Sequence, residues 1–485
     1  MMIAPVAMSG AIAVRSVARI ASRLTIAFAA IVFAVTLSRP AQAMNIQTIK
    51  SPGGIEAWLV EEHSVPLMAL RFAFVGGNSQ DPTGKDGVAN FITAMMDEGA
   101  GDVPSAEFQE RMEDIAMRMS FDDSKDGLYG SFETLSANRD KAIALLKLAI
   151  QKPRFDADAV DRIRQQLLAN IAYADKDPDK VAGREWYALA FAGHPYGRPS
   201  NGTVETVSKI TRDDLVAFHK RTFAKSNLKV VAVGDIDAAT FGKMLDDVFG
   251  GLPDEADLLP VPMTEPIGGQ QKVIEMNVPQ SVAVFGLAAM ARKDPDFMAA
   301  FVVNHILGGG GFSSKLMEEV REKRGLAYSV YSYLQPYEHT SILSGSVATK
   351  NEAMAESLSI IRAEMKKMAD NGPTAEDLQA AKDYLTGSYA LRFDTNAKIA
   401  SQLLGLQVEG FGTDYVDTRN KLVEAVSMED AKRVAKRFLD PDKLIVTVVG
   451  KPTGLGVDVA PKMPASESAP AGGASVAPAK SANPG

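Results

Sequence analysis

Two side chains seven residues apart, Arg321 and Tyr328, have the types and spacing that best suit chemistry in this sequence. They lie in the stretch VREKRGLAYSV, which sets a guanidinium cation and a phenol on either side of Gly325. A plainer interpretation makes Arg321 a surface cation and Tyr328 a half-buried strand residue, since both residue types are common in such places. The elements that carry the pair decide between these interpretations.

The pair is expected to flank a sharp corner between a short helix and a strand. Ser313 or Ser314 can cap the helix. Its apolar side has i, i+3, i+4 spacing and consists of Leu316, Met317 and Val320. Gly325 suits the end of the helix, and the aromatic and β-branched residues 326–333 predict a strand.

A run of glycines opens the same stretch, just before the helix. Glycine lacks a side chain, so such a run allows the backbone to approach another chain closely. The run consists of Gly308, Gly309, Gly310 and Gly311. An extended chain lying beside this corner would therefore meet bare backbone.

Metal-ligating side chains are few and poorly spaced. The sequence has no cysteine, which excludes disulfides, thiolate metal sites and a cysteine nucleophile. The five histidines show no ligand spacing; they are His63, His194, His219, His305 and His339. The acidic pairs Asp97-Glu98 and Asp122-Asp123 are typical of solvated faces. The residue pattern therefore indicates no metal site of its own.

The first 43 residues are expected to be a signal peptide. Arg15, Arg19 and Arg23 precede an uncharged apolar run, and an Ala-Gln-Ala cleavage site ends at Ala43. The apolar run of 14 residues is short for a membrane helix, although an uncleaved anchor is the alternative. Cleavage removes four arginines and no acid, which takes the net charge from −8 to −12. We therefore predict an exported, periplasmic protein without nucleic acid or anionic membrane partners.

The full chain, with 485 residues of which 46% are apolar, is long enough for several domains. Residues 210–235 match residues 426–451 without a gap, each block being a helix followed by a buried strand that ends in glycine. Such an offset indicates two duplicated domains rather than a solenoid. Proline-rich residues 251–270 predict an extended linker, and residues 456–485 a disordered tail. Composition and periodicity thus predict two duplicated α/β or α+β domains.

The stretch around Arg321 and Tyr328 resembles the C-terminal half of the pitrilysin/insulinase (inverzincin) family of zinc peptidases. In that family an Arg and a Tyr seven apart, inside R-x-K-x-G-L-A-Y-like text, face the zinc site of another domain. The resemblance covers roughly residues 50–455 and implies an α+β fold. It implies two duplicated α/β-roll domains of the metallopeptidase LuxS-like type, forming a clamshell half. The expected N-terminal domain is 44–250, and the C-terminal domain, 271–455, carries the pair.

The family's inverted zinc motif, His-x-x-Glu-His on the first long helix, is degenerate here. In this sequence the corresponding helix is predicted from about Lys85 to Glu98, ended by Gly99. In the motif two histidines one helical turn apart hold Zn²⁺, and the glutamate is the general base. The matching positions are Asn90, Thr93 and Ala94, and the distal glutamate falls on Asn170, or on Ala169 if the register slips by one. Asn90 offers only a neutral oxygen, Thr93 is no general base near neutral pH, and Ala94 has no ligand atom. We expect no zinc in this chain.

Some members of the family are heterodimers, in which one subunit carries zinc and the other keeps the Arg/Tyr pair. The resemblance therefore implies a non-zinc-binding subunit of a metalloendopeptidase, inactive alone and active with a homologous zinc-bearing partner. Arg321 and Tyr328 would be catalytic in trans, with Tyr328 directed at the developing oxyanion. The residues expected to bind a peptide or unfolded-protein substrate are Gly308, Gly309, Gly310 and Gly311.

Two other interpretations stay open. Degenerate subunits of respiratory-complex relatives are scaffolds, so this chain could be a non-enzymatic scaffold or peptide-binding protein of the cell envelope. An independently active peptidase is the third interpretation, and it requires a different metal site. A neighbouring reading frame with an intact His-x-x-Glu-His motif would favour the heterodimer.

Overall fold

The structure is a computed structural model in which residues 44–455 are described. Two compact units divide the chain, residues 1–47 and residues 48–485, and only residues 44–47 of the first are described. The predicted signal peptide and the predicted disordered tail lie outside the described residues. Within the second unit we call residues 48–250 the N-terminal half and residues 271–455 the C-terminal half.

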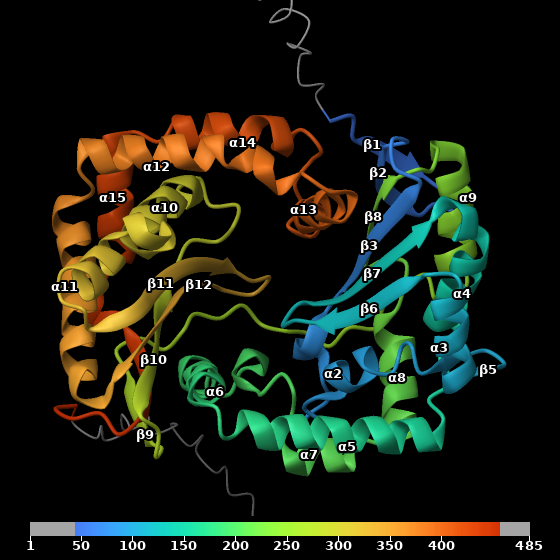
Figure 1. Cartoon of the computed structure of the whole chain (residues 1–485), viewed down its shortest axis with the longest axis horizontal. Coiled ribbons are helices and arrows are strands. Elements are labelled where there is room, and N and C mark those ends of the chain that lie inside the picture. Colours follow the sequence, from blue (N-terminus) through green and yellow to red (C-terminus); the bar gives the residue numbers. More distant parts are fainter. Residues whose placement is uncertain (1–43, 456–485) are drawn as a thin grey trace, which may run out of the picture. The chain divides into compact units, whose positions relative to one another are not determined.

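The N-terminal half is built on a six-stranded sheet with strand order β1-β2-β8-β3-β7-β6 (Figure 1). Its strands are β1 (Gln47–Lys50), β2 (Glu56–Glu61), β3 (Leu67–Val75), β6 (Arg118–Asp123), β7 (Gly127–Leu135) and β8 (Leu228–Gly234). β2 and β8 are parallel, and β3 is antiparallel to both β8 and β7. A short hairpin, β4 (Gly99–Ala100) and β5 (Val103–Pro104), stands apart from this sheet.

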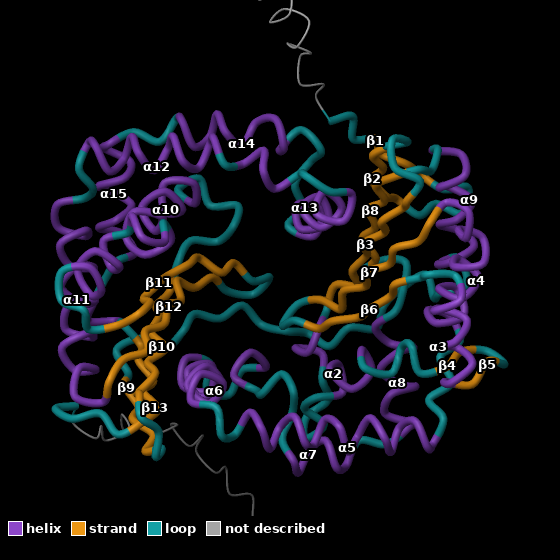
Figure 2. The backbone as a smooth tube through the Cα atoms, in the orientation of Figure 1, coloured by secondary structure: helices purple, strands orange, loops and turns teal. Residues whose placement is uncertain are grey.

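The C-terminal half repeats this topology in a five-stranded sheet with strand order β11-β12-β10-β13-β9. Its strands are β9 (Gln271–Glu275), β10 (Gln280–Ala288), β11 (Ala327–Pro336), β12 (Ser341–Lys350) and β13 (Ile445–Gly450). β9 and β13 are parallel, and the other neighbours are antiparallel, as in the first sheet. Both sheets contain parallel and antiparallel pairs. Helices lie beside both of them (Figure 2), so the expected α+β class is confirmed.

Helices pack on the sheets and complete two apolar cores. Those of the N-terminal half are α2 (Val88–Thr93), α3 (Ser105–Asp114), α4 (Arg139–Gln151), α5 (Ala157–Ala174), α6 (Pro178–Ala190), α7 (Val204–Lys209), α8 (Arg212–Thr222) and α9 (Ala238–Phe249). Those of the C-terminal half are α10 (Phe297–Asn304), α11 (Met354–Asn371), α12 (Ala375–Gly387), α13 (Asn396–Val408), α14 (Tyr415–Glu424) and α15 (Met428–Phe438). None of the helices in 44–455 has the length and apolar character needed to cross a membrane.

The duplicated blocks found in the sequence form the same structure twice. Helices α8 and α15 each begin with a capping box, Thr211 with Asp214 and Ser427 with Asp430. The strands that follow them, β8 and β13, both run beside the central strand of their sheet. The repeat therefore extends from sequence to local hydrogen bonds and topology. The exact domain limits stay a prediction.

One helix of each half packs on the sheet of the other half. Helix α6 of the N-terminal half contacts β10 and β13, and its Trp186 indole donates a hydrogen bond to the Ile445 carbonyl at 3.2 Å. Helix α13 of the C-terminal half contacts β3 and β8, and its Ser401 hydroxyl accepts from Arg71 Nε at 3.3 Å. The two halves are thus joined by exchanged helices as well as by the linker.

The helix expected from about Lys85 to Glu98 is shorter in the structure, where α2 covers only Val88–Thr93. The buried carboxylate of Asp81 accepts hydrogen bonds from the backbone N–H groups of Gly87 (2.7 Å) and Ala89 (2.9 Å) and so fixes its start. After Ala94 the chain turns toward β4, so the apolar residues beyond it are buried in turns. The apolar pattern predicted burial correctly and helix length wrongly.

Candidate functional site

The corner expected between helix and strand is present. The Ser314 hydroxyl accepts a hydrogen bond from the Met317 backbone N–H at 3.4 Å, and residues Met317–Glu322 form a π-helical segment. Its predicted apolar side is buried against the core. Gly325 ends the segment with a φ of +62°, which favours glycine, and β11 starts two residues later. Local sequence signals are enough to form this corner.

At the corner Arg321 lies between two aromatic rings. Its guanidinium carbon is 5.1 Å from the centre of the Tyr328 ring and 4.6 Å from the centre of the Phe312 ring. Both rings face solvent, with Tyr328 84% and Phe312 71% exposed. The nearest carboxylate is that of Glu322, 3.4 Å from Arg321 Nη1. Two cation–π contacts therefore hold the guanidinium on the surface.

A β-bulge explains why Tyr328 points outward. The pairing of β11 with β12 shifts between Ala327 and Val330, and both of these residues are buried. The residues between them leave the regular ladder, and Tyr328 is turned toward solvent. Within the described part of the chain its hydroxyl has no hydrogen-bond partner. The corner thus offers the Tyr328 phenol as a free donor to another molecule, next to a guanidinium whose ion-pair partner is Glu322.

The glycine run lies directly beside this corner, but its closest approaches are to its own chain. Gly308 is buried, and a Cβ there would come within 2.3 Å of Ser332 Oγ on β11. Gly310 is half-buried, and a Cβ there would come within 2.9 Å of the His305 carbonyl oxygen. Packing within the chain therefore explains why Gly308 and Gly310 have no side chain. The sequence analysis expected instead that another chain approaches the backbone at these positions.

The other two glycines of the run, Gly309 and Gly311, are exposed. Gly311 has a φ of +59° and open space around the position of a Cβ. An approach by another molecule is thus possible at these two positions, and substrate binding by the run stays a prediction. Phe312, which the sequence analysis missed, follows the run directly. A lone aromatic after four glycines was the available signal.

Two of the degenerate zinc positions, Asn90 and Thr93, belong to a network of hydrogen bonds. Asn90 Nδ2 on α2 donates to Asp123 Oδ1 at 3.0 Å, and Asn78 Nδ2 donates to Asp123 Oδ2 at 2.8 Å. Burial raises the pKa of Asp123, and the two amides oppose that shift. Thr93 Oγ1 donates to the Asn90 carbonyl at 2.9 Å, while Asn170 on α5 is exposed. The side chains at Asn90, Thr93 and Asn170 are neutral, and the carboxylate of this network is that of Asp123.

Between this network and α6 lies a polar pocket of ≈ 560 Å³, lined by both halves. Lys125 is buried in it, 7% exposed, and donates to the Arg198 carbonyl at 2.9 Å. Burial lowers the pKa of Lys125 to about 8. The far wall contains Gln335 and Tyr337. Among the described residues no group of three or more His, Cys, Asp or Glu side chains could hold a metal ion.

The structure keeps the Arg/Tyr pair away from the degenerate zinc positions. Gln335, at one end of β11, lines the polar pocket, whereas Tyr328 lies at the other end. Seven residues of extended strand separate them, which is roughly 20 Å. Arg321 and Tyr328 are therefore brought together with Phe312 but not with Asn90, Thr93, Ala94 or Asn170.

Comparisons with known proteins match both halves of the chain to one peptidase family. Residues 59–204 match the insulinase model of peptidase family M16, and residues 209–385 match the model described as the peptidase M16 inactive domain. The crystal structure of a peptidase M16 inactive domain from Pseudomonas fluorescens is 31% identical, with a TM-score of 0.79 over 84% of this chain and 98% of that one. A Helicobacter pylori protease structure, 18% identical, has a TM-score of 0.77 over 84% and 99%.

Curated relatives include proteins named as non-peptidase homologs and proteins named as zinc proteases. The Helicobacter pylori non-peptidase homolog YmxG is 26% identical over 80% of this chain and 90% of its own length. An uncharacterized zinc protease of Mycobacterium tuberculosis is 26% identical over 82% of this chain and 92% of its own. The chain belongs to peptidase family M16. The resemblance to the insulinase family is confirmed, and the C-terminal match is to the inactive type of domain.

Proposed function

We propose that this chain is the non-zinc-binding subunit of an M16 zinc metalloendopeptidase, working with a homologous zinc-bearing partner. The observation that carries the proposal is the corner at which the exposed Tyr328 phenol lies against the Arg321 guanidinium, in a chain whose described residues include no group of three His, Asp or Glu side chains that could hold a metal ion. The strand-length separation from the degenerate zinc positions favours action on another subunit. The non-ligating residues at those positions agree with zinc being held only by the partner.

In this proposal the zinc-bearing partner supplies the activated water for attack on a peptide carbonyl. Tyr328 donates its phenolic hydrogen to the carbonyl oxygen as negative charge develops on it. Arg321 positions the Tyr328 ring through their stacked contact and adds positive charge at the same place. The exposed backbone at Gly309 and Gly311 leaves room for an extended substrate beside the corner. The substrate is a peptide or unfolded protein.

The location is part of the proposal. Export by the predicted signal peptide would place the heterodimer in the periplasm, where peptides and unfolded envelope proteins are available. The acidic charge of the chain argues against nucleic acid as its partner and agrees with a homologous protein subunit in that role. A signal-peptidase cleavage assay on the expressed chain checks the location.

Peptidase activity with parallel zinc analysis tests the proposal. The chain is assayed alone and mixed with the M16 homologue of its own organism that has an intact zinc motif. We expect activity only in the mixture, with zinc only in the partner. Tyr328→Phe should lower the rate of the mixture about 10²–10³-fold, the usual effect of removing one oxyanion donor. Tyr333→Phe, which removes an exposed phenol from the same strand, is the matched control and should have little effect.

Three outcomes would count against the proposal. Full activity of the mixture with Tyr328→Phe would remove the oxyanion role. Stoichiometric zinc and activity in the chain alone would mean that another metal site exists. An inactive mixture in which the two chains still associate would favour the scaffold or peptide-binding interpretation.

A further inference from the structure

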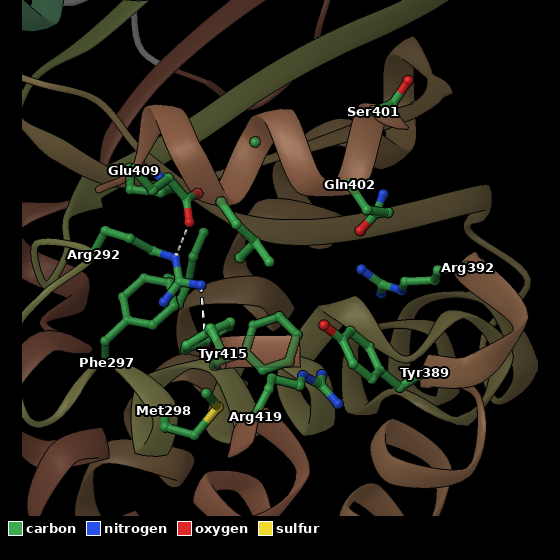
Figure 3. A pocket seen from close by; sticks show the side chains of 15 residues that line it. Arg292, Phe297, Met298, Tyr389, Arg392, Ser401, Gln402, Glu409, Tyr415 and Arg419 are labelled. Atoms are coloured by element: carbon green, nitrogen blue, oxygen red, sulfur yellow. Dashed lines mark hydrogen bonds and ion pairs between the residues drawn. The ribbon is translucent and has the colours of Figure 1, made fainter. Parts of the chain in front are cut away.

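A second site lies entirely within the C-terminal half, in a pocket of ≈ 280 Å³ that we call the arginine pocket. It is bounded by the start of α10, by helix α13, by the start of α14, and by the turn Tyr389–Arg392. Figure 3 shows Gln402, Arg392 and Tyr389 on one side of this pocket and Arg292 with Glu409 on the other. Neither the Arg321 corner nor the polar pocket shares these residues.

The arginine pocket contains three guanidinium groups and one carboxylate. Arg292 Nε donates to Glu409 Oε2 at 2.8 Å, so this cation is neutralised. Arg419 is 5% exposed, and its Nη1 donates to the Leu385 carbonyl and to Asn420 Oδ1, both neutral acceptors. Arg392 has no hydrogen bond or ion pair among residues 44–455. Two positive charges in the pocket thus lack a counter-ion in the described chain.

A buried, unpaired cation is costly, so its presence points to a missing anion. Taking a guanidinium out of water without a carboxylate carries a large desolvation penalty that neutral acceptors offset only in part. Burial and the nearby positive charges of Arg392 and Arg292 hold the pKa of Arg419 below its ordinary value, although it stays protonated at neutral pH. An incoming carboxylate would relieve both the desolvation and the repulsion among these arginines.

The rest of the wall is apolar and aromatic. The Arg419 guanidinium carbon is 4.5 Å from the centre of the Tyr389 ring, and that of Arg292 is 4.5 Å from the centre of the Phe297 ring. Phe301 and Leu406 also line the pocket. Such a lining suits an apolar side chain, while the Tyr389 hydroxyl and the Gln402 amide can bond to polar atoms beside it. The fitting ligand therefore combines a carboxylate with an apolar group.

The dimensions favour the end of a peptide chain. A volume of ≈ 280 Å³ lies at the lower limit for small-molecule pockets and is enough for about one amino-acid residue. A second hollow of ≈ 510 Å³ adjoins it and shares Arg392, Ser401 and Gln402. It continues past Lys398 toward Arg71 on β3. A chain whose last residue fills the arginine pocket can thus extend through this hollow.

We propose that the arginine pocket binds the C-terminal carboxylate of a peptide whose last side chain is apolar. The carboxylate lies between Arg392 and Arg419, and the side chain lies against Phe297 and Phe301. This inference rests on the proposed function only in taking peptides as ligands, and it makes the pocket an anchor for substrates or products with a free C-terminus. It assigns the substrate class that the Arg321 corner alone leaves open.

Binding to the chain alone tests this inference without any catalytic partner. A fluorescein-labelled Gly-Gly-Ala-Phe peptide is titrated by fluorescence anisotropy as the free acid and as the C-terminal amide. The free acid should bind at least about tenfold more tightly, because the amide loses a charge-assisted contact. Arg392→Ala, at an exposed position, should lower the free-acid affinity about tenfold and leave the amide affinity unchanged.

Controls separate the pocket from general electrostatics. Arg111→Ala on α3 removes the same charge from an exposed i,i+4 pair and should leave binding unchanged. Equal affinity for acid and amide, or an equal loss in Arg111→Ala, would overturn the proposal. Binding of 3-phenylpropionate as tight as that of the peptide acid would also overturn it, since the ligand would then be a free acid. Failure of the peptidase assay leaves these results unaffected, so the two proposals fail independently.

Discussion

The two halves contain the same helix-to-strand corner, filled in opposite ways. In the C-terminal half Arg321 and Tyr328 stand four residues before and three residues after Gly325, whose φ is +62°. At the equivalent corner of the N-terminal half Ala116 has the positive φ (50°), and β6 begins two residues after it, as β11 does after Gly325. The positions equivalent to the pair hold Met112 and Met119, both buried.

The comparison shows that the fold does not need a cation and a phenol at this corner. Two methionines give the same backbone path with the side chains inside. By contrast, both halves keep a cross-strand pair of phenylalanine and glycine, Phe72 with Gly130 and Phe285 with Gly345. What the duplication repeats is therefore packing. The Arg321/Tyr328 pair, with its exposed phenol, occurs in one half only and is therefore the candidate for function.

Exchanging the corner chemistry should produce the largest effect. We expect the double variant Arg321→Met, Tyr328→Met to lose at least about 10²–10³-fold of the activity of the mixture with the zinc-bearing partner. Its thermal unfolding should change little, since exposed substitutions usually stay within about 0.5 kcal/mol. Parallel activity assays and melting curves measure both quantities. A large loss of stability with little loss of activity would show that the pair is structural.

One aspartate precedes the first helix of each half, and the contributions of the two aspartates to stability should change with pH in opposite directions. Burial raises the pKa of Asp81 to about 7, whereas the Arg437 guanidinium lowers the pKa of Asp294, the equivalent residue of the Asp-Pro pair in the C-terminal half. The pKa of Asp81 is higher in the folded chain than in the unfolded chain. The stabilisation of the folded chain by this carboxyl is therefore complete below about pH 4 and is lost as the pH rises through about 7. For Asp294 the contribution is complete above about pH 4 and is lost as the pH falls through its lowered pKa.

Urea unfolding of Asp81→Asn and Asp294→Asn against the parent chain checks this contrast. The unfolding free energy of the parent chain minus that of Asp81→Asn should fall by about 2–4 kcal/mol between pH 4 and pH 7.5. The difference for Asp294 should stay constant in that range and shrink only at more acidic pH. If the difference in unfolding free energy changed with pH in the same way for both variants, the two aspartates would not have opposite pKa shifts.

Replacing the glycine by alanine in either of the repeated phenylalanine–glycine pairs should lower the stability of the chain by a similar amount. A Cβ on Gly130 would come within 2.0 Å of the Phe72 ring, and a Cβ on Gly345 within 2.4 Å of the Phe285 ring. We expect Gly130→Ala and Gly345→Ala each to destabilise the chain by about 1–3 kcal/mol through overpacking. Gly183→Ala, in helix α6 with open space around it, should be neutral or slightly stabilising. Denaturant midpoints measure all three, and a harmless Gly130→Ala would show that the pair is not a packing constraint.

Local signals in the sequence predicted most of the fold and part of the site. The internal repeat located α8 and α15, and a capping serine with apolar periodicity located the corner at Gly325, because these elements are fixed by nearby residues. The length of α2 was mispredicted, since Asp81 and the turn after Ala94 act from outside the helix. The contact between Arg321 and Phe312 and the bulge at Tyr328 depend on pairing with other elements, which the residue pattern alone does not encode.

The exchange of α6 and α13 has a consequence for biosynthesis. The N-terminal sheet is complete in sequence once β8 has been made, but the helix that covers β3 and β8 belongs to the C-terminal half. During synthesis this face stays bare until residues 396–408 have followed. An early intermediate therefore presents apolar strands to its surroundings, and we expect such a chain to depend on a holdase chaperone until that helix has been made.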